Sequence, residues 1–185
     1  GKSTAGRLLA QRLGWQFADS DDEIEHATGR KVPEIFAEEG EAAFRKRECD
    51  AIRKLAQREP IVIATGGGAV TVPETRALLG DGFVVWLSVS PEEAARRLGQ
   101  DPSTSERPLL AGDTRGRLEA LLQARRELYS AADAAIDVDD LSPQIVSSEL
   151  FNLWQEWACS PVAHGDRLYG RSEHEPHRLP SVLQP

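Results

Sequence analysis

Apolar residues recur along the first 158 positions in two patterns that alternate with each other. Apolar positions three or four residues apart predict helices over about 3–13, 73–79, 91–98, 118–129 and 143–157. Short continuous apolar runs predict buried strands over about 15–18, 61–64, 83–87 and 135–138. Between residues 23 and 58 the glycines and a proline (Gly29, Pro33 and Gly40) break the apolar pattern, which predicts a run of short helices. Strands that alternate with helices predict an α/β fold with a parallel sheet.

Two segments lack this periodicity. Residues 99–113 are rich in Gly, Pro, Ser, Thr and Asp, which predicts a mobile loop. Residues 160–185 hold four of the eleven prolines and show little apolar spacing. We therefore expect one domain over residues 1–158 and a disordered C-terminal tail over 159–185.

Composition narrows the class of protein. A net charge of −8 over 185 residues argues against a nucleic-acid surface, which normally shows a clustered basic face. The two cysteines, Cys49 and Cys159, argue against a disulfide framework. No apolar run approaches the roughly 20 residues of a membrane-spanning helix. We therefore expect a cytoplasmic enzyme or binding domain without nucleic-acid or membrane partners.

The chain opens on Gly1-Lys2-Ser3-Thr4, and a predicted helix follows at once. These residues match the end of the phosphate-binding loop G-x-x-x-x-G-K-[ST], in which backbone N–H groups cradle phosphates, Lys reaches the terminal phosphates and Ser or Thr binds Mg²⁺. A lysine at a helix start is the alternative interpretation. Because the chain starts inside the motif and has no Met, we expect a fragment that lacks the strand before the loop.

Two carboxylates, Asp19 and Asp21, follow the first predicted strand. Ligands of parallel sheets bind outside the carboxyl ends of the strands, where these residues fall. Residues two apart on an extended chain share a face, so we expect one carboxylate to bind a metal and the other a substrate hydroxyl. The alternative is that they only cap the next helix, a role open also to Ser20 and Asp22.

The second predicted strand ends in Gly66-Gly67-Gly68. Three glycines allow a ligand to approach the backbone closely, or serve a loop that needs positive φ. Arginines pair with phosphate or carboxylate groups through the planar guanidinium, and Arg45, Arg107 and Arg125 are candidates for that role. Solvated surface arginines are the alternative.

In order along the chain, these residues resemble the shikimate kinases over residues 1 to about 157. The segments that carry the resemblance are Phe17 to Glu25, Thr28-Gly29, Ile35 to Arg45, Gly66 to Val70, Arg107 to Leu110, Arg125 and Leu128-Tyr129. The chain departs from the family in having Arg126-Glu127 where a proline commonly precedes Leu-Tyr.

The resemblance implies a P-loop kinase fold with three αβα layers and a lid, similar to the nucleoside monophosphate kinases. It implies transfer of the ATP γ-phosphoryl group to the 3-hydroxyl of shikimate, with Mg²⁺ as cofactor. Lys2 would neutralise phosphate charge and Ser3 and Asp19 would hold the metal. Gly1, Thr4 and Arg97 would contact the nucleotide, with residues 139–143 near adenine and ribose.

The resemblance also implies a substrate region over about 20–58 and a lid over about 99–114. Asp21 would contact the shikimate hydroxyls and act as base. Arg45 and Arg125 would bind the shikimate carboxylate beside the glycines Gly66, Gly67 and Gly68. Arg107 would supply a transition-state cation from the lid.

Two other functions compete with this one. A related small-molecule kinase such as a gluconate kinase would share the phosphate loop, but not the paired aspartates with both arginines. A non-catalytic kinase-like binding module would not need Lys2, Asp21 and Arg107. We expect a monomer. Because the strand before the phosphate loop is central in this family, we also expect a gap in the sheet, low stability and no activity for residues 1–185 alone.

Overall fold

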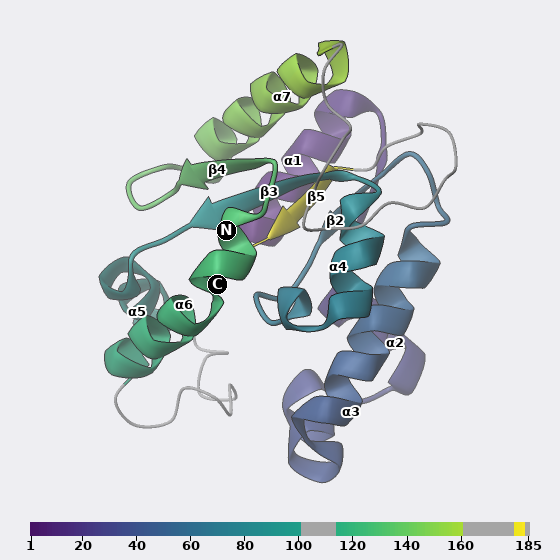
Figure 1. The fold of residues 1–185 in the computed structure, drawn as a ribbon, viewed down its shortest axis with the longest axis vertical. Helices are drawn as coiled ribbons and strands as arrows, with labels where there is room; N and C mark the ends of the chain where they lie inside the picture. The colour runs from purple at the N-terminus through teal and green to yellow at the C-terminus, as the bar shows by residue number, and fades with distance from the viewer. Residues whose placement is uncertain (101–113, 161–179, 184–185) are drawn as a thin grey trace.

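A computed structural model describes residues 1–100, 114–160 and 180–183, which form seven helices, a short 3₁₀ turn and one parallel sheet of five strands (Figure 1). The elements in chain order are α1 (Lys2–Leu13), β1 (Gln16–Asp19), α2 (Ser20–Thr28), α3 (Val32–Leu55), β2 (Ile61–Ala64), η1 (Ala69–Thr71), α4 (Pro73–Gly80), β3 (Phe83–Ser88), α5 (Pro91–Gln100), α6 (Thr114–Ser130), β4 (Ala134–Asp137), α7 (Pro143–Cys159) and β5 (Pro180–Leu183). The predicted α/β class is confirmed, and each predicted helix and strand before residue 158 is present.

The alternation of side chains along β3 separates two hydrophobic cores. Phe83, Val85 and Leu87 are buried against α1 and α7 on one face of the sheet. Val84 is buried on the other face with residues of α3, α4 and α6. Successive residues of a strand point to opposite faces, so a strand that is apolar at every position must be covered on both. Helices therefore cover the sheet on both sides and give three layers (Figure 1).

The sheet order is β1-β2-β5-β3-β4, and every pairing is parallel. The middle strand, β5, comes from the C-terminal segment. Its backbone pairs with β2 (Ile63 with Ser181, Ala64 with Val182) and with β3 from Phe83 to Trp86. Pro180 begins the strand, a position where a missing N–H is tolerated in a sheet.

Two expectations from the sequence are wrong at this strand. Disorder was expected over 159–185, yet Cys159 ends α7 and residues 180–183 form β5. An unfilled position was expected in the middle of the sheet, but β5 fills it and pairs with both neighbours. The expected low stability depended on two strands with unpaired backbone groups, which this arrangement does not leave.

The region between β1 and β2 is less broken than predicted. Pro33 lies in the first turn of α3, where proline is compatible with a helix, and does not interrupt it. Gly40 is non-helical, with φ 80° and ψ 173°, and kinks α3. After the kink, Phe44, Glu48 and Ile52 are buried.

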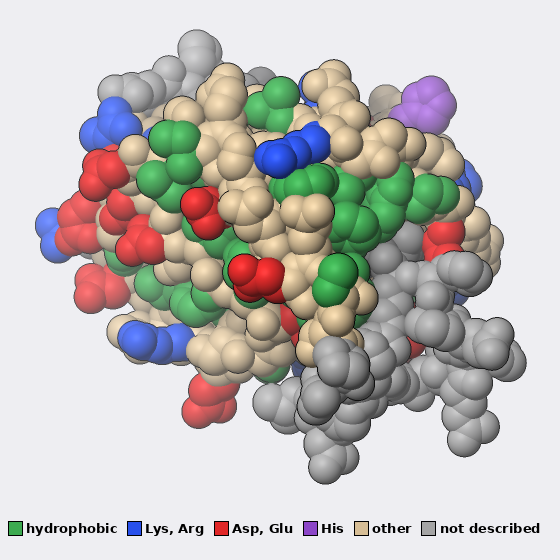
Figure 2. Space-filling model, turned by 90° about the horizontal axis from the view of Figure 1, so that it is seen from above, with side chains coloured by type: hydrophobic (Ala, Val, Ile, Leu, Met, Phe, Trp, Pro, Cys, Tyr) green, Lys and Arg blue, Asp and Glu red, His purple; other side chains and the backbone are tan. Residues whose placement is uncertain are grey.

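On the face shown in Figure 2, acidic and basic side chains are interspersed and do not form one basic surface. Within the described residues, no helix is both long enough and apolar enough to cross a membrane. Cys49 is buried and Cys159 exposed, and both are free thiols.

Removing β5 tests its place in the sheet. A chain that ends at residue 179 leaves facing backbone groups of β2 and β3 unpaired, and each buried unpaired group costs about 1–3 kcal/mol. We expect its free energy of unfolding to fall by at least about 3 kcal/mol relative to a chain that ends at residue 183, as measured by urea unfolding. Equal stability of the two chains would show that β5 does not hold the sheet together.

Candidate active site

The predicted site residues gather where β1 and β2 end and where α1 begins. The parallel register sets Asp19 at the end of β1 opposite Ala64 at the end of β2. The carboxylate segment and the glycine segment therefore leave the sheet side by side. The first turn of α1 lies next to them, because the Ser3 hydroxyl donates to Asp19 Oδ2 over 2.6 Å.

Asp19 links three segments of the chain. Its Oδ2 accepts from Ser3 and lies 4.0 Å from Lys2 Nζ, while its Oδ1 accepts from the backbone N–H of Asp21 over 3.0 Å. Asp19 is thus the N-cap of α2, the role that the alternative interpretation gave to this cluster. The expected extended-chain geometry is wrong, because α2 begins at Ser20 and Asp21 occupies its first turn. The Asp19 side chain therefore caps α2 and also lies beside Lys2 and Ser3.

The donor set at Asp19 and Ser3 fits a magnesium ion. Mg²⁺ prefers hard oxygen ligands and is usually held by one or two carboxylates together with substrate phosphates and water. Here a carboxylate and a hydroxyl lie in contact beside a lysine at a helix N-terminus. The described residues contain no cluster of three or more His, Cys, Asp or Glu side chains suited to a metal. A metal held by Asp19 and Ser3 would need further ligands beyond these two side chains.

The glycine segment is needed for close approach and not for unusual backbone angles. Neither Gly66 nor Gly68 has a positive φ, so the alternative based on positive φ is wrong for them. A Cβ on Gly66 would lie 2.9 Å from Glu48 Oε1 and 3.8 Å from Asp21 Oδ1. A Cβ on Gly68 would overlap the guanidinium of Arg45. Side chains of α2 and α3 thus press directly against the loop backbone.

Arg45 is held over the loop by two carboxylates of its own helix. Its Nη1 donates to Glu48 Oε2 over 2.6 Å, and its Nε and Nη2 lie 3.3 Å from Glu41 Oε1. The Glu48 side chain is 1% exposed and Arg45 11%, whereas Glu41 is 50% exposed. Glu48 is therefore the fixed partner, and the long contacts to Glu41 are the exchangeable ones.

Glu48 is a charged group in an apolar setting. Burial raises its pKa to about 7, against the charge and hydrogen bond of Arg45, and the charge of Asp21 adds to the rise while that of Lys2 opposes it. Its Oε1 is buried without a hydrogen-bond partner. The sequence analysis missed this residue. The pattern that could have indicated Glu48 is an acidic residue three positions after Arg45, among apolar residues on the buried side of a helix.

Arg125 reaches the same loop through Tyr129, one turn later on α6. The Tyr129 hydroxyl donates to the Gly67 carbonyl over 2.8 Å, and its ring, fully buried, stacks on Trp86. Burial raises the pKa of Tyr129, while a hydrogen bond and the charge of Arg125 oppose the rise. Tyr129 entered the sequence analysis only as part of a resemblance, because nothing in its spacing indicated a contact with residue 67.

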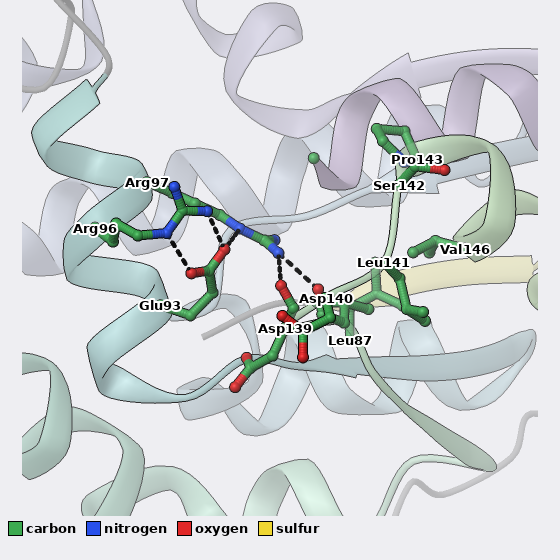
Figure 3. A pocket seen from close by; sticks show the side chains of 12 residues that line it. Leu87, Glu93, Arg96, Arg97, Asp139, Asp140, Leu141, Ser142, Pro143 and Val146 are labelled. Atoms are coloured by element: carbon green, nitrogen blue, oxygen red, sulfur yellow. Dashed lines mark hydrogen bonds and ion pairs between the residues drawn. The ribbon is translucent and has the colours of Figure 1, made fainter.

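A cavity of about 480 Å³ lies beside Gly1, the N-cap of α1, with Arg97 and Asp139 also in its lining. Figure 3 shows Arg97 pointing from α5 toward the segment after β4. Its Nη2 donates to the carbonyls of Val138 (2.6 Å) and Asp139 (2.7 Å), and its Nε donates to Glu93. Hydrogen bonds from Arg96 and Arg97 lower the pKa of Glu93 to about 2. Arg97 and residues 139–143 thus line the same cavity, and their expected place near adenine and ribose stays a prediction.

Most of the expected site residues therefore meet at one edge of the sheet. Asp21, Arg45 and the glycine segment form one group, and Lys2, Ser3 and Asp19 form an adjoining one. Thr4 follows in the first turn of α1. Arg107 and most of the expected lid lie outside the described residues.

Comparison with known proteins gives one consistent family. A sequence model of the shikimate kinases matches residues 1–154. A shikimate kinase of Synechococcus sp. is 44% identical over 83% of this chain and 76% of that protein. One of Moorella thermoacetica is 45% identical over 85% of this chain and 90% of that protein.

A solved structure is similar in fold as well. The shikimate kinase of Acinetobacter baumannii, crystallised in complex with shikimate, superposes with a TM-score of 0.79 at 36% identity. The match covers 86% of this chain and 89% of that one.

The raised pKa of Glu48 predicts a specific pH dependence of stability. A carboxyl group whose pKa is raised on folding binds its proton more tightly in the folded state, so its contribution to stability is complete below about pH 4.5 and is lost as the pH rises to about 7. We expect wild type to lose on the order of 2–3 kcal/mol more stability than Glu48→Gln between pH 4.5 and 8. Urea unfolding at both pH values measures this difference, with the exposed Glu74→Gln as control. A Glu48→Gln profile parallel to wild type would refute the raised pKa.

Proposed function

The chain belongs to the shikimate kinase family, and we propose that it transfers the γ-phosphoryl group of ATP to the 3-hydroxyl of shikimate at the site formed by α1, α2, α3 and the glycine segment. The observation that supports this assignment most strongly is the convergence of Arg45 and Asp21 on the backbone of Gly66 to Gly68. A cation and a carboxylate that meet the same three-residue loop match a substrate that carries a carboxylate and hydroxyl groups.

Arg45 binds the substrate carboxylate in this proposal. Its guanidinium keeps the 2.6 Å bond to buried Glu48 and exchanges the 3.3 Å contacts to exposed Glu41 for the substrate. A planar guanidinium can then present two parallel N–H donors to one carboxylate. Arg125 supplies a second cation from α6, placed through its contact with Tyr129.

Asp21 receives the reacting hydroxyl. Its carboxylate lies at the N-terminus of α2 and faces Gly66, beside the position that Arg45 assigns to the substrate. In the transfer step a bond forms between the 3-hydroxyl oxygen and the γ-phosphorus, the bond from that phosphorus to the β,γ-bridging oxygen breaks, and the hydroxyl proton passes to Asp21. ADP leaves with the electron pair of the broken bond.

The phosphates of ATP lie at the start of α1. The N–H groups of its first turn, from Gly1 to Thr4, and the ammonium of Lys2 provide positive charge where phosphate charge develops. Ser3 and Asp19 would hold Mg²⁺, which neutralises phosphate charge when bound. The adenosine part would occupy the cavity next to Arg97, and Arg107 would complete the charge stabilisation from the lid segment.

Other small-molecule kinases are weaker candidates. A gluconate kinase needs the phosphate-binding residues but gives no reason for a glycine segment enclosed by Arg45, Glu48 and Asp21. The chain has Lys2, Asp19 and Asp21, and Asp19 contacts both of the others. This arrangement argues against a binding module without catalysis. We also propose a monomer that acts in the cytoplasm without nucleic-acid or membrane partners.

Asp21→Asn tests the assignment of the base. The change keeps the size of the side chain but removes the group that accepts the proton, a contribution of typically 10²–10⁴-fold. We expect kcat for shikimate-dependent ADP release to fall at least about 100-fold, with the ATP dissociation constant within about threefold of wild type. Asp22→Asn, at the exposed neighbouring position, is the matched control and should stay near wild type. Normal turnover of Asp21→Asn would remove this residue from the mechanism.

A further inference from the structure

The Tyr129 hydroxyl ties the glycine segment to α6. The Gly67 carbonyl accepts the Tyr129 hydroxyl over 2.8 Å. The neighbouring carbonyls are satisfied locally instead, Gly66 by the N–H of Ala69 and Gly68 by the N–H and hydroxyl of Thr71. The middle carbonyl of the loop thus depends on a residue 62 positions away in sequence.

The Tyr129 side chain is itself immobilised. It is fully buried, and its ring stacks on Trp86 of β3 with centroids 5.4 Å apart and planes 21° apart. Burial also raises its pKa, so the hydroxyl keeps the proton that it donates. A rigid donor fixed against the central sheet can set the position of a loop that has no side chains of its own.

The same hydroxyl is shared with a binding residue. Arg125 precedes Tyr129 by four positions, on the same face of α6, and lies close enough for its charge to lower the pKa of the Tyr129 hydroxyl. Arg45 lies against the next residue of the loop, Gly68. The Tyr129 hydroxyl therefore bonds to the backbone of Gly67 and lies next to Arg125.

We propose that Tyr129 is a positioning residue for the acceptor substrate, which fixes the glycine segment and Arg125 relative to Arg45 through its single hydroxyl. This role rests on the proposed shikimate site and extends it. The substrate carboxylate must meet two cations at a set separation, and Tyr129 determines that separation without touching the substrate. Loss of the Tyr129 hydroxyl should weaken binding of shikimate and leave the nucleotide site unaffected. In the described part of the chain, no hydrogen bond or ion pair joins Tyr129 to Lys2, Ser3 or Asp19.

The test is Tyr129→Phe, which keeps the ring stacked on Trp86 and removes only the hydroxyl. We expect KM for shikimate to rise about tenfold or more, with kcat within about threefold and KM for ATP within about twofold of wild type. Thr71→Val is the matched control: it also removes a hydroxyl bonded to the loop, but the Gly68 carbonyl keeps the Thr71 N–H. This control should stay within about twofold of wild type in both KM values.

Each other outcome has a definite meaning. Wild-type KM for shikimate in Tyr129→Phe, in a folded variant with normal kcat, overturns the positioning role while the proposed function stands. An equal rise in both KM values, or a fall in kcat alone, also overturns it, because that pattern indicates general loosening of the fold. If wild type releases no ADP on addition of shikimate, the proposed function itself fails. Thermal unfolding of each variant confirms that assays are run on folded protein.

Discussion

The parallel pairing of β1 with β2, in the register that sets Asp19 opposite Ala64, determines where the chemistry of this protein can occur. It brings the first turn of α2 and the glycine segment out of the sheet at neighbouring points. A shift of one residue would turn each side chain of β1 to the other face and move Asp19 away from Ser3. The contacts of Asp19 with α1 and of Gly66 with α2 and α3 all follow from this register.

Close packing at that edge explains several residue types together. Arg45 and Glu48 need the space that a Cβ at residues 66 and 68 would take. A buried carboxylate is costly unless it is paired, and Arg45 is the partner that makes Glu48 tolerable. In return Glu48 holds the guanidinium in one place. The site is therefore built before any substrate arrives, at the cost of an acid whose pKa is raised by burial.

Periodicity was sufficient to predict the elements of the main domain, because its helices and strands are long enough to repeat. The glycines and both aspartates were predictable from their position after strands. β5 was not predictable, because its four residues, which begin with Pro180, carry no periodic pattern. They form a strand because they pair with β2 on one side and β3 on the other. The contacts of Glu48 and Tyr129 could not be predicted, because they form between α3, α6 and the loop, and sequence spacing does not encode them. Asp21 was expected on an extended chain, where the structure has a helix capped by Asp19.

The central claim is that Arg45, fixed over the glycine segment, binds the carboxylate of the substrate. Calorimetric titration of shikimate and of its neutral carboxamide, into wild type and Arg45→Ala, measures that contact directly. We expect wild type to bind shikimate at least about tenfold more tightly than the carboxamide, and Arg45→Ala to reduce this preference to about threefold or less. Arg47→Ala, which removes an exposed arginine paired with Glu39, should keep the full preference. A full preference in Arg45→Ala would contradict the account, because the carboxylate would then be recognised elsewhere.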